Sequence, residues 1–160
     1  MSMDHVCITV RDVDKSIDFY SRGLGLKLLR VSVLRPRPKT EFKNAYMYSD
    51  QFLLELLTAK PAVIRSRTPD TWEKTLQGSL GITHLGMRVH NLDEAVKRVK
   101  AAGGHMIDEP IQVARKTTNF AYVSNKVDPK IRYAKKPGKK PWRNAIFSDP
   151  DGIIIELVER

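Results

Sequence analysis

The sequence predicts an α+β fold built from two copies of one βαβββ module. The first observation is a repeat: residues 4–17 match residues 83–96 at a constant offset of 79, which pairs His5 with His84. The second is that residues 52–57 match residues 153–158 at an offset of 101, which pairs Glu55 with Glu156. The third is a strand pattern followed by a helix pattern at the start of each copy.

The first module is predicted over residues 1–58. Residues 5–10 alternate in polarity as a half-buried strand does. A helix follows, with Asp14 able to cap it and Ile17, Tyr20 and Leu24 spaced along one face. Strands are predicted over 27–34, 41–49 and 51–58, and residues 59–81 are predicted to link the two modules.

The second module is predicted over residues 82–160, in the same order. A strand over 84–89 leads into a helix that Asp93 is placed to cap, and strands are predicted over 105–107, 144–148 and 153–159. The sequence Asp-Pro-Asp-Gly at 149–152 is a strong turn signal between the last two strands. The larger second offset places 22 extra residues inside this module.

The extra residues coincide with a basic insertion at about 115–143. This stretch holds ten Lys or Arg and one acid, whereas the rest of the chain has eighteen basic and seventeen acidic residues. The net charge of +10 therefore comes almost entirely from one segment, which argues against nucleic-acid binding by the whole domain. The insertion is either a solvated loop or a lid over an anionic substrate, with nucleic-acid or partner binding as the weaker alternatives.

Composition limits the class of protein. The chain has 160 residues, 41% of them hydrophobic, which is enough for a buried core. No apolar run is long enough to span a membrane, and the first residues do not resemble a signal peptide. Cys7 is the single cysteine, so no internal disulfide forms, and we expect a cytoplasmic location.

Two acidic residues stand in strands that are otherwise apolar. Glu55 and Glu156 each lie within a run of aliphatic residues, where an ionised carboxylate must be paired or bound to a metal. His5 and His84 begin equivalent strands of the two modules. If the modules pack around a pseudo-twofold axis, two imidazoles and two carboxylates converge and predict a site for a divalent metal ion.

The repeat, the four residues and the 147–157 hairpin resemble the vicinal oxygen chelate superfamily, and within it glyoxalase I. The resemblance implies two βαβββ modules forming a curved mixed sheet around a metal-binding cleft. It implies metal ligation by His5, Glu55, His84 and Glu156, with the two glutamates also as catalytic residues and Glu156 favoured as the base. The ion is Ni, Co, Zn, Mn or Fe, because all of these accept nitrogen and oxygen ligands.

The implied activity is that of a metal-dependent lyase or isomerase acting on an oxygen-rich, possibly anionic small molecule through a metal-chelated enediolate. Thr9 and Ala59 stand where bacterial glyoxalase I has two glutathione-binding residues, which argues against a glutathione hemithioacetal substrate. Substrate contacts are predicted from Arg88 on the His84 strand and from Tyr122, Lys126, Arg132 and Trp142.

Alternatives remain within the same superfamily. A ring-cleaving dioxygenase commonly uses two His and one Glu, and an epimerase usually has Gln where this chain has Glu55. A non-catalytic small-molecule binding or resistance protein is the third. Some relatives build each site within one chain and others across a dimer, and by this analogy we expect a homodimer.

Overall fold

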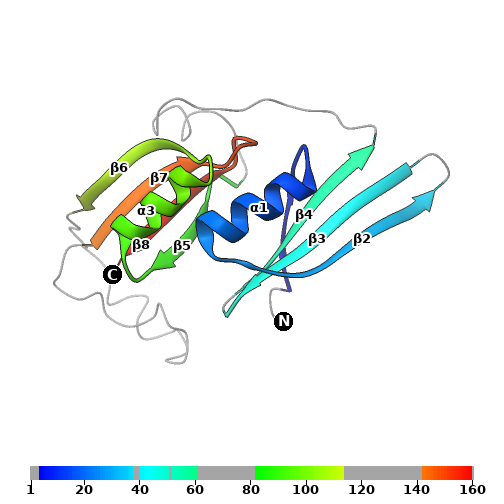
Figure 1. The fold of residues 1–160 in the computed structure, drawn as a ribbon, viewed down its shortest axis with the longest axis horizontal. Coiled ribbons are helices and arrows are strands. Elements are labelled where there is room, and N and C mark those ends of the chain that lie inside the picture. The colour runs from blue at the N-terminus through cyan, green and yellow to red at the C-terminus, as the bar shows by residue number, and fades with distance from the viewer. Residues whose placement is uncertain (1–3, 38–39, 51, 61–81, 114–141, 160) are drawn as a thin grey trace, which may run out of the picture.

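The computed structural model describes residues 4–37, 40–50, 52–60, 82–113 and 142–159. These residues form two helices and eight strands, drawn in chain order from blue to red (Figure 1). The first half contains β1 (Val6–Thr9), α1 (Val13–Leu24), β2 (Lys27–Arg37), β3 (Thr40–Ser49) and β4 (Phe52–Lys60). The second contains β5 (Leu85–Val89), α3 (Leu92–Ala101), β6 (His105–Val113), β7 (Trp142–Ser148) and β8 (Ile154–Glu159).

The two halves have the same topology, which confirms the predicted α+β fold of paired βαβββ modules. Strand order is β1-β4-β3-β2 in one sheet and β5-β8-β7-β6 in the other. In each sheet the first strand pairs in parallel with the last, and the remaining pairs are antiparallel. The eight strands form two four-stranded sheets and do not continue as one, because β1 and β5 are each the edge of their own sheet.

The N-caps of both helices lie two residues before the predicted caps, Asp14 and Asp93. The N-cap of α1 is Asp12, whose carboxylate accepts from the backbone N–H groups of Asp14 and Lys15. The N-cap of α3 is Asn91, which accepts from the N–H of Glu94. Both caps have extended backbone, which is what a capping residue requires, whereas Asp14 and Asp93 lie in the first turn and favour the helix dipole.

Strand β6 runs from His105 to Val113, well beyond the predicted 105–107. Its pairing with β7 shifts register between Met106 and Asp108 and again between Asp108 and Ile111, an interval that contains Pro110. These irregularities break the alternation of polarity, so the sequence pattern ended the strand too early.

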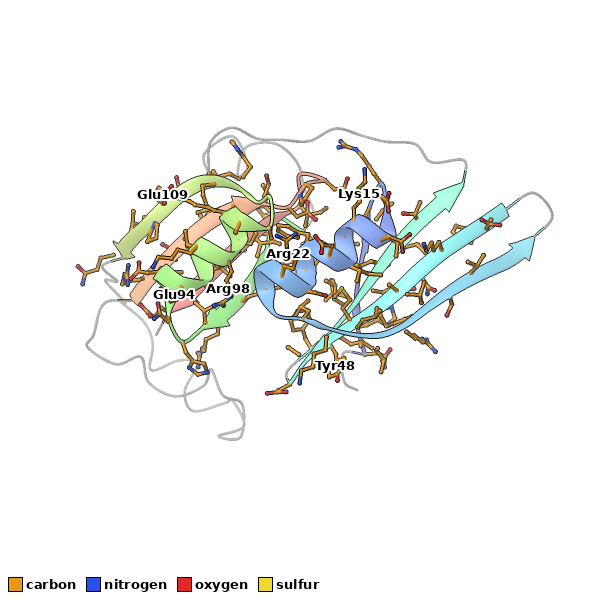
Figure 2. All side chains as sticks on the ribbon, viewed as in Figure 1. Lys15, Arg22, Tyr48, Glu94, Arg98 and Glu109 are labelled. Carbon is orange, nitrogen blue, oxygen red and sulfur yellow. The ribbon has the colours of Figure 1, made fainter. Side chains whose placement is uncertain are left out.

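The two modules pack on one another through their helices (Figure 1). A Cβ on Gly23 of α1 would lie 3.3 Å from the Cβ of Ala102, so the glycine permits close approach to the end of α3. Arg22, labelled beside α3 in Figure 2, donates to the carbonyl oxygen of Ala101 at 3.4 Å. Aromatic contact continues from α1 to β7, where the ring centroids of Phe19 and Phe147 are 6.3 Å apart.

A buried hydrogen bond joins the modules at the predicted 149–152 turn. Tyr20 on α1 is fully buried, and its hydroxyl donates to Oδ2 of Asp149 at 2.9 Å. The other carboxylate oxygen of Asp149 accepts from the backbone N–H groups of Asp151 and Ile153. One side chain therefore holds both the turn and the contact between modules. Among helices in the described ranges, none has the length and apolar character of a membrane span.

Replacing Asp149 is expected to destabilise the fold substantially. Asp149→Ala should lower the free energy of unfolding by about 2–4 kcal/mol, because the buried Tyr20 hydroxyl and two backbone N–H groups lose their acceptor. Asp149→Asn keeps the oxygen that accepts from the backbone and should cost less than about 1 kcal/mol. Urea unfolding followed by circular dichroism checks both values, and equal losses for the two variants would contradict this account.

The contribution of Asp149 to stability is also expected to depend on pH. Burial raises the pKa of Asp149 above its ordinary value of 3.8. The folded state therefore holds this proton more tightly than the unfolded state, so the contribution of Asp149 to stability falls as the pH rises above 3.8. Asp149→Asn should remove this part of the decline when unfolding is measured across a pH series.

Candidate metal centre

The first pair of predicted ligands, His5 and Glu55, is brought together by two neighbouring strands. His5 directly precedes β1, and β1 pairs in parallel with β4 in a register that sets Cys7 opposite Glu55. Nε2 of His5 lies 3.2 Å from Oε2 of Glu55. The other ring nitrogen, Nδ1, donates to the Asp4 carboxylate at 2.8 Å, which orients the ring so that Nε2 faces the glutamate.

Glu55 is held as an ionised carboxylate. Its side chain is only 13% exposed, and burial alone would raise its pKa. Hydrogen bonds from Asn44, Cys7 and Tyr46, with the nearby His5, outweigh burial and lower the pKa of Glu55. Burial and the neighbouring Glu55 raise the pKa of Cys7 to about 11, so at neutral pH this residue is a thiol that donates a hydrogen bond.

An aromatic and cationic stack continues from His5 across the same face of the sheet. Tyr46 lies opposite Glu55 in the β3–β4 register, and its ring meets that of His5 edge to face, with centroids 5.6 Å apart. The guanidinium carbon of Arg30, an exposed residue opposite Tyr46 in the β2–β3 register, lies 4.4 Å from the Tyr46 ring centroid. This face therefore presents a positive charge beyond the His5 and Glu55 pair.

The second pair repeats this arrangement in the other module. His84 directly precedes β5, and Gly86 lies opposite Glu156 in the parallel β5–β8 register. Nε2 of His84 is 3.5 Å from Oε2 of Glu156, whose side chain is 18% exposed. Asn144 on β7 donates to Oε1 of Glu156 at 2.8 Å. Gly86 stands where the first module has Cys7, so this carboxylate has more open space beside it.

The structure brings the four predicted ligands together as two pairs and not as one group. We call His5 with Glu55 the first half-site and His84 with Glu156 the second half-site. Within the described ranges, no three His, Cys, Asp or Glu side chains lie close enough together to hold one metal ion. One described chain therefore presents two separate half-sites, because the modules meet through α1 and α3.

Each half-site nevertheless has the spacing of two ligands of one ion. Ligand atoms about 2.1 Å from a common metal lie roughly 3.0 to 3.4 Å apart at octahedral or tetrahedral angles. The Nε2 to Oε2 distances of 3.2 and 3.5 Å are close to this spacing. The donor set, one imidazole and one carboxylate in each half-site, suits a divalent transition metal. Metal binding by these residues remains a prediction.

The other predicted site residues are only partly described. Arg88 is exposed on β5 and shares a strand face with His84 and Gly86. Tyr122, Lys126 and Arg132 lie outside the described residues, and of Trp142 the structure describes the backbone in β7. Arg143, at the end of the basic insertion, forms ion pairs with Asp93 and Glu159 and so is not directed at the half-sites.

Sequence reasoning missed the residues around the glutamates, namely Asn44, Tyr46, Arg30 and Asn144. A signal was present in the strand that precedes each apolar run containing a glutamate, at residues 52–57 and 153–158. Asn44-Ala45 is followed by Ser49-Asp50, and Asn144-Ala145 is followed by Ser148-Asp149, so this strand also repeats between the modules. The repeated asparagine could have been identified from the sequence alone. The contacts of Tyr46 and Arg30 follow only from the register in which the strands pair.

Comparison with known proteins identifies the group to which these features belong. The family model of the glyoxalase/bleomycin resistance protein/dioxygenase superfamily matches residues 2–157. The chain is 30% identical over 159 residues to a lactoylglutathione lyase of Escherichia coli O157:H7, covering 99% of this chain and 93% of that protein.

Solved structures show the same fold. A glyoxalase family protein from Bacillus cereus matches with a TM-score of 0.71 at 20% identity, covering 99% of this chain and 93% of the other. The fosfomycin resistance protein FosX of Listeria monocytogenes, solved with Mn(II) and sulfate, matches with a TM-score of 0.58 at 14% identity. That match covers 99% of this chain and 92% of FosX.

Proposed function

Because the chain belongs to the glyoxalase/bleomycin resistance protein/dioxygenase superfamily, we propose that it is a metal-dependent lyase or isomerase of glyoxalase type. The observation that carries this proposal is the duplicated half-site, in which an imidazole nitrogen and a carboxylate oxygen lie 3.2 or 3.5 Å apart. The lactoylglutathione lyases related to it at 30% identity support the reaction class.

The chemistry that the residues support is proton transfer beside a carbonyl group. A divalent ion, when bound, supplies Lewis-acid stabilisation of negative charge on the reacting oxygens. Glu156 takes the proton from the carbon next to the carbonyl and returns it to the adjacent carbon. The resemblance to glyoxalase I favours Glu156 as the base, and the lowered pKa of Glu55 makes that carboxylate a poor proton acceptor.

The proposed substrate is an oxygen-rich small molecule that carries a negative charge. Arg30 and Arg88 are exposed residues on the faces of the first and second half-sites, so a carboxylate or phosphate of a substrate would meet positive charge there. Thr9 and Ala59 replace the two glutathione-binding residues of bacterial glyoxalase I. Arg30 would contact a substrate anion from a different position than those two residues do. The proposed substrate is therefore not a glutathione hemithioacetal.

We propose that the complete site is formed by two copies of the chain in a cytoplasmic homodimer. Both histidines flank the edge strands β1 and β5, so a second chain can bring its second half-site beside the first without disturbing the described strand pairs. Twofold symmetry then produces two equivalent sites per dimer.

Metal analysis and isotope exchange test the proposal together. Purified protein is expected to contain about one divalent ion per chain, since a symmetric dimer has two shared sites. Chelation should stop the exchange of substrate α-protons with deuterium oxide, measured on a panel of dicarbonyl-derived and hydroxy-ketone compounds. Adding Ni, Co, Zn or Mn should restore the exchange.

Two outcomes would contradict it. Metal-free protein with unaltered turnover would exclude a metal-dependent reaction. Tight binding of a panel compound without deuterium incorporation would instead support a binding or sequestering protein, since binding alone exchanges no carbon-bound proton.

A further inference from the structure

Each glutamate of the half-sites is held by an asparagine from the neighbouring strand. Nδ2 of Asn44 donates to Oε1 of Glu55 at 2.7 Å, and Nδ2 of Asn144 donates to Oε1 of Glu156 at 2.8 Å. Asn44 lies two residues before Tyr46, the residue opposite Glu55, and Asn144 lies two residues before Ile146, the residue opposite Glu156. The contact is thus the same diagonal pair in both modules.

Both asparagines are almost completely buried, at 3% and 9% exposure. The Oδ1 atom of each has no hydrogen-bond partner among the described residues. A buried acceptor without a partner costs folding free energy, and an aliphatic residue of similar size would avoid that cost. Because the costly residue occurs at both equivalent positions, packing does not account for it, whereas the bond to the glutamate does.

The bond assigns different roles to the two oxygens of each carboxylate. The amide N–H can only donate, so it occupies Oε1 and leaves Oε2 facing Nε2 of the histidine. An amide carries no charge near neutral pH, so this constraint does not change when the surrounding groups titrate.

We propose that Asn44 and Asn144 are positioning residues that restrict Glu55 and Glu156 to binding an ion through Oε2 alone. This inference rests on the proposed metal-dependent function. If two half-sites held one ion, two imidazole nitrogens and two single carboxylate oxygens would supply four donor atoms, and the remaining coordination positions would be available to a substrate. A carboxylate that turned to bind through both oxygens would occupy a position that the substrate needs.

The test replaces each asparagine by leucine, which removes the donor and the unpaired acceptor together. Asn44→Leu and Asn144→Leu are each expected to weaken Co²⁺ binding about 10- to 100-fold by calorimetry, while thermal stability stays equal or rises. The visible absorption of bound Co²⁺ should also change, because the carboxylate is free to bind differently. Asn44→Ala and Asn144→Ala, which require no larger side chain to pack, should show the same loss of affinity.

Ser148→Ala is the matched control. Ser148 is also buried on β7, and its Oγ has no partner among the described residues. This variant should bind Co²⁺ with the wild-type dissociation constant and spectrum. Folded Asn44 and Asn144 variants with wild-type affinity and spectrum would overturn the positioning role while leaving the metal site intact. Wild-type protein that binds no Co²⁺ would instead overturn the proposed function, and the positioning role with it.

Discussion

Chains carrying His5→Ala and chains carrying His84→Ala are each expected to be inactive alone and active when combined. In the proposed homodimer, whose sites are shared between chains, each variant removes one proposed ligand from both sites. In a mixed dimer, one site collects both substitutions and the other receives an intact first half-site from one chain and an intact second half-site from its partner. Random mixing should therefore restore about a quarter of wild-type activity.

The experiment is best performed by co-expressing the two variants and measuring metal content and turnover of the purified mixture. His90→Ala is the control, since His90 is an exposed histidine that follows the end of β5, whereas His84 precedes its start. An inactive mixture in which two differently tagged variants co-purify as mixed dimers would place the complete site within one chain. Activity in either single variant at wild-type level would remove that histidine from the site.

The two glutamates are expected to respond differently to loss of charge. Glu156→Gln should lower kcat by roughly 100- to 10,000-fold even at saturating metal, which is the range expected when a general base is removed. Glu55→Gln should mainly weaken metal binding and retain proton exchange at saturating metal. The reason is that a lowered pKa makes Glu55 a poor proton acceptor, so its role in the proposed site is that of a metal ligand.

Metal affinity by calorimetry and kcat at saturating metal separate the two effects. Ser148→Ala again serves as a control for a buried change near β8. If Glu55→Gln abolished proton exchange while Glu156→Gln retained it, the assignment of base and ligand would be reversed. If both variants retained full turnover, neither carboxylate would be the base.

Much of the architecture followed from the repeat. The matching segments at 4–17 and 83–96 led to β1 with α1 and to β5 with α3, because a strand alternates with a period of two and a helix recurs every 3.6 residues. The Asp-Pro-Asp-Gly turn formed where its residue types require, with Gly152 at φ 85°. The pairing of His5 with Glu55 and of His84 with Glu156 also agrees with the repeated positions.

Other features needed the pairing of strands. The asparagines that hold the glutamates reach them from the neighbouring strands β3 and β7. Whether they meet the glutamates depends on the register in which β3 pairs with β4 and β7 pairs with β8. For the same reason the sequence did not predict Arg30 and Tyr46 as site residues, since both lie beside the first half-site on neighbouring strands. Local periodicity contains no information about which residues lie opposite one another in a sheet.

Local pattern alone was thus enough to identify two copies of one module, each with an imidazole and a carboxylate in equivalent strands. How the copies face one another is a property of the folded chain: Tyr20 bonds to Asp149, α1 packs against α3, and β1 and β5 remain sheet edges. Such contacts depend on shape and burial between segments far apart in the chain: Arg22 and Ala101 are 79 residues apart, and Tyr20 and Asp149 are 129 residues apart. For this reason the residue types of the proposed metal site were readable from the chain, whereas its division into two half-sites was not.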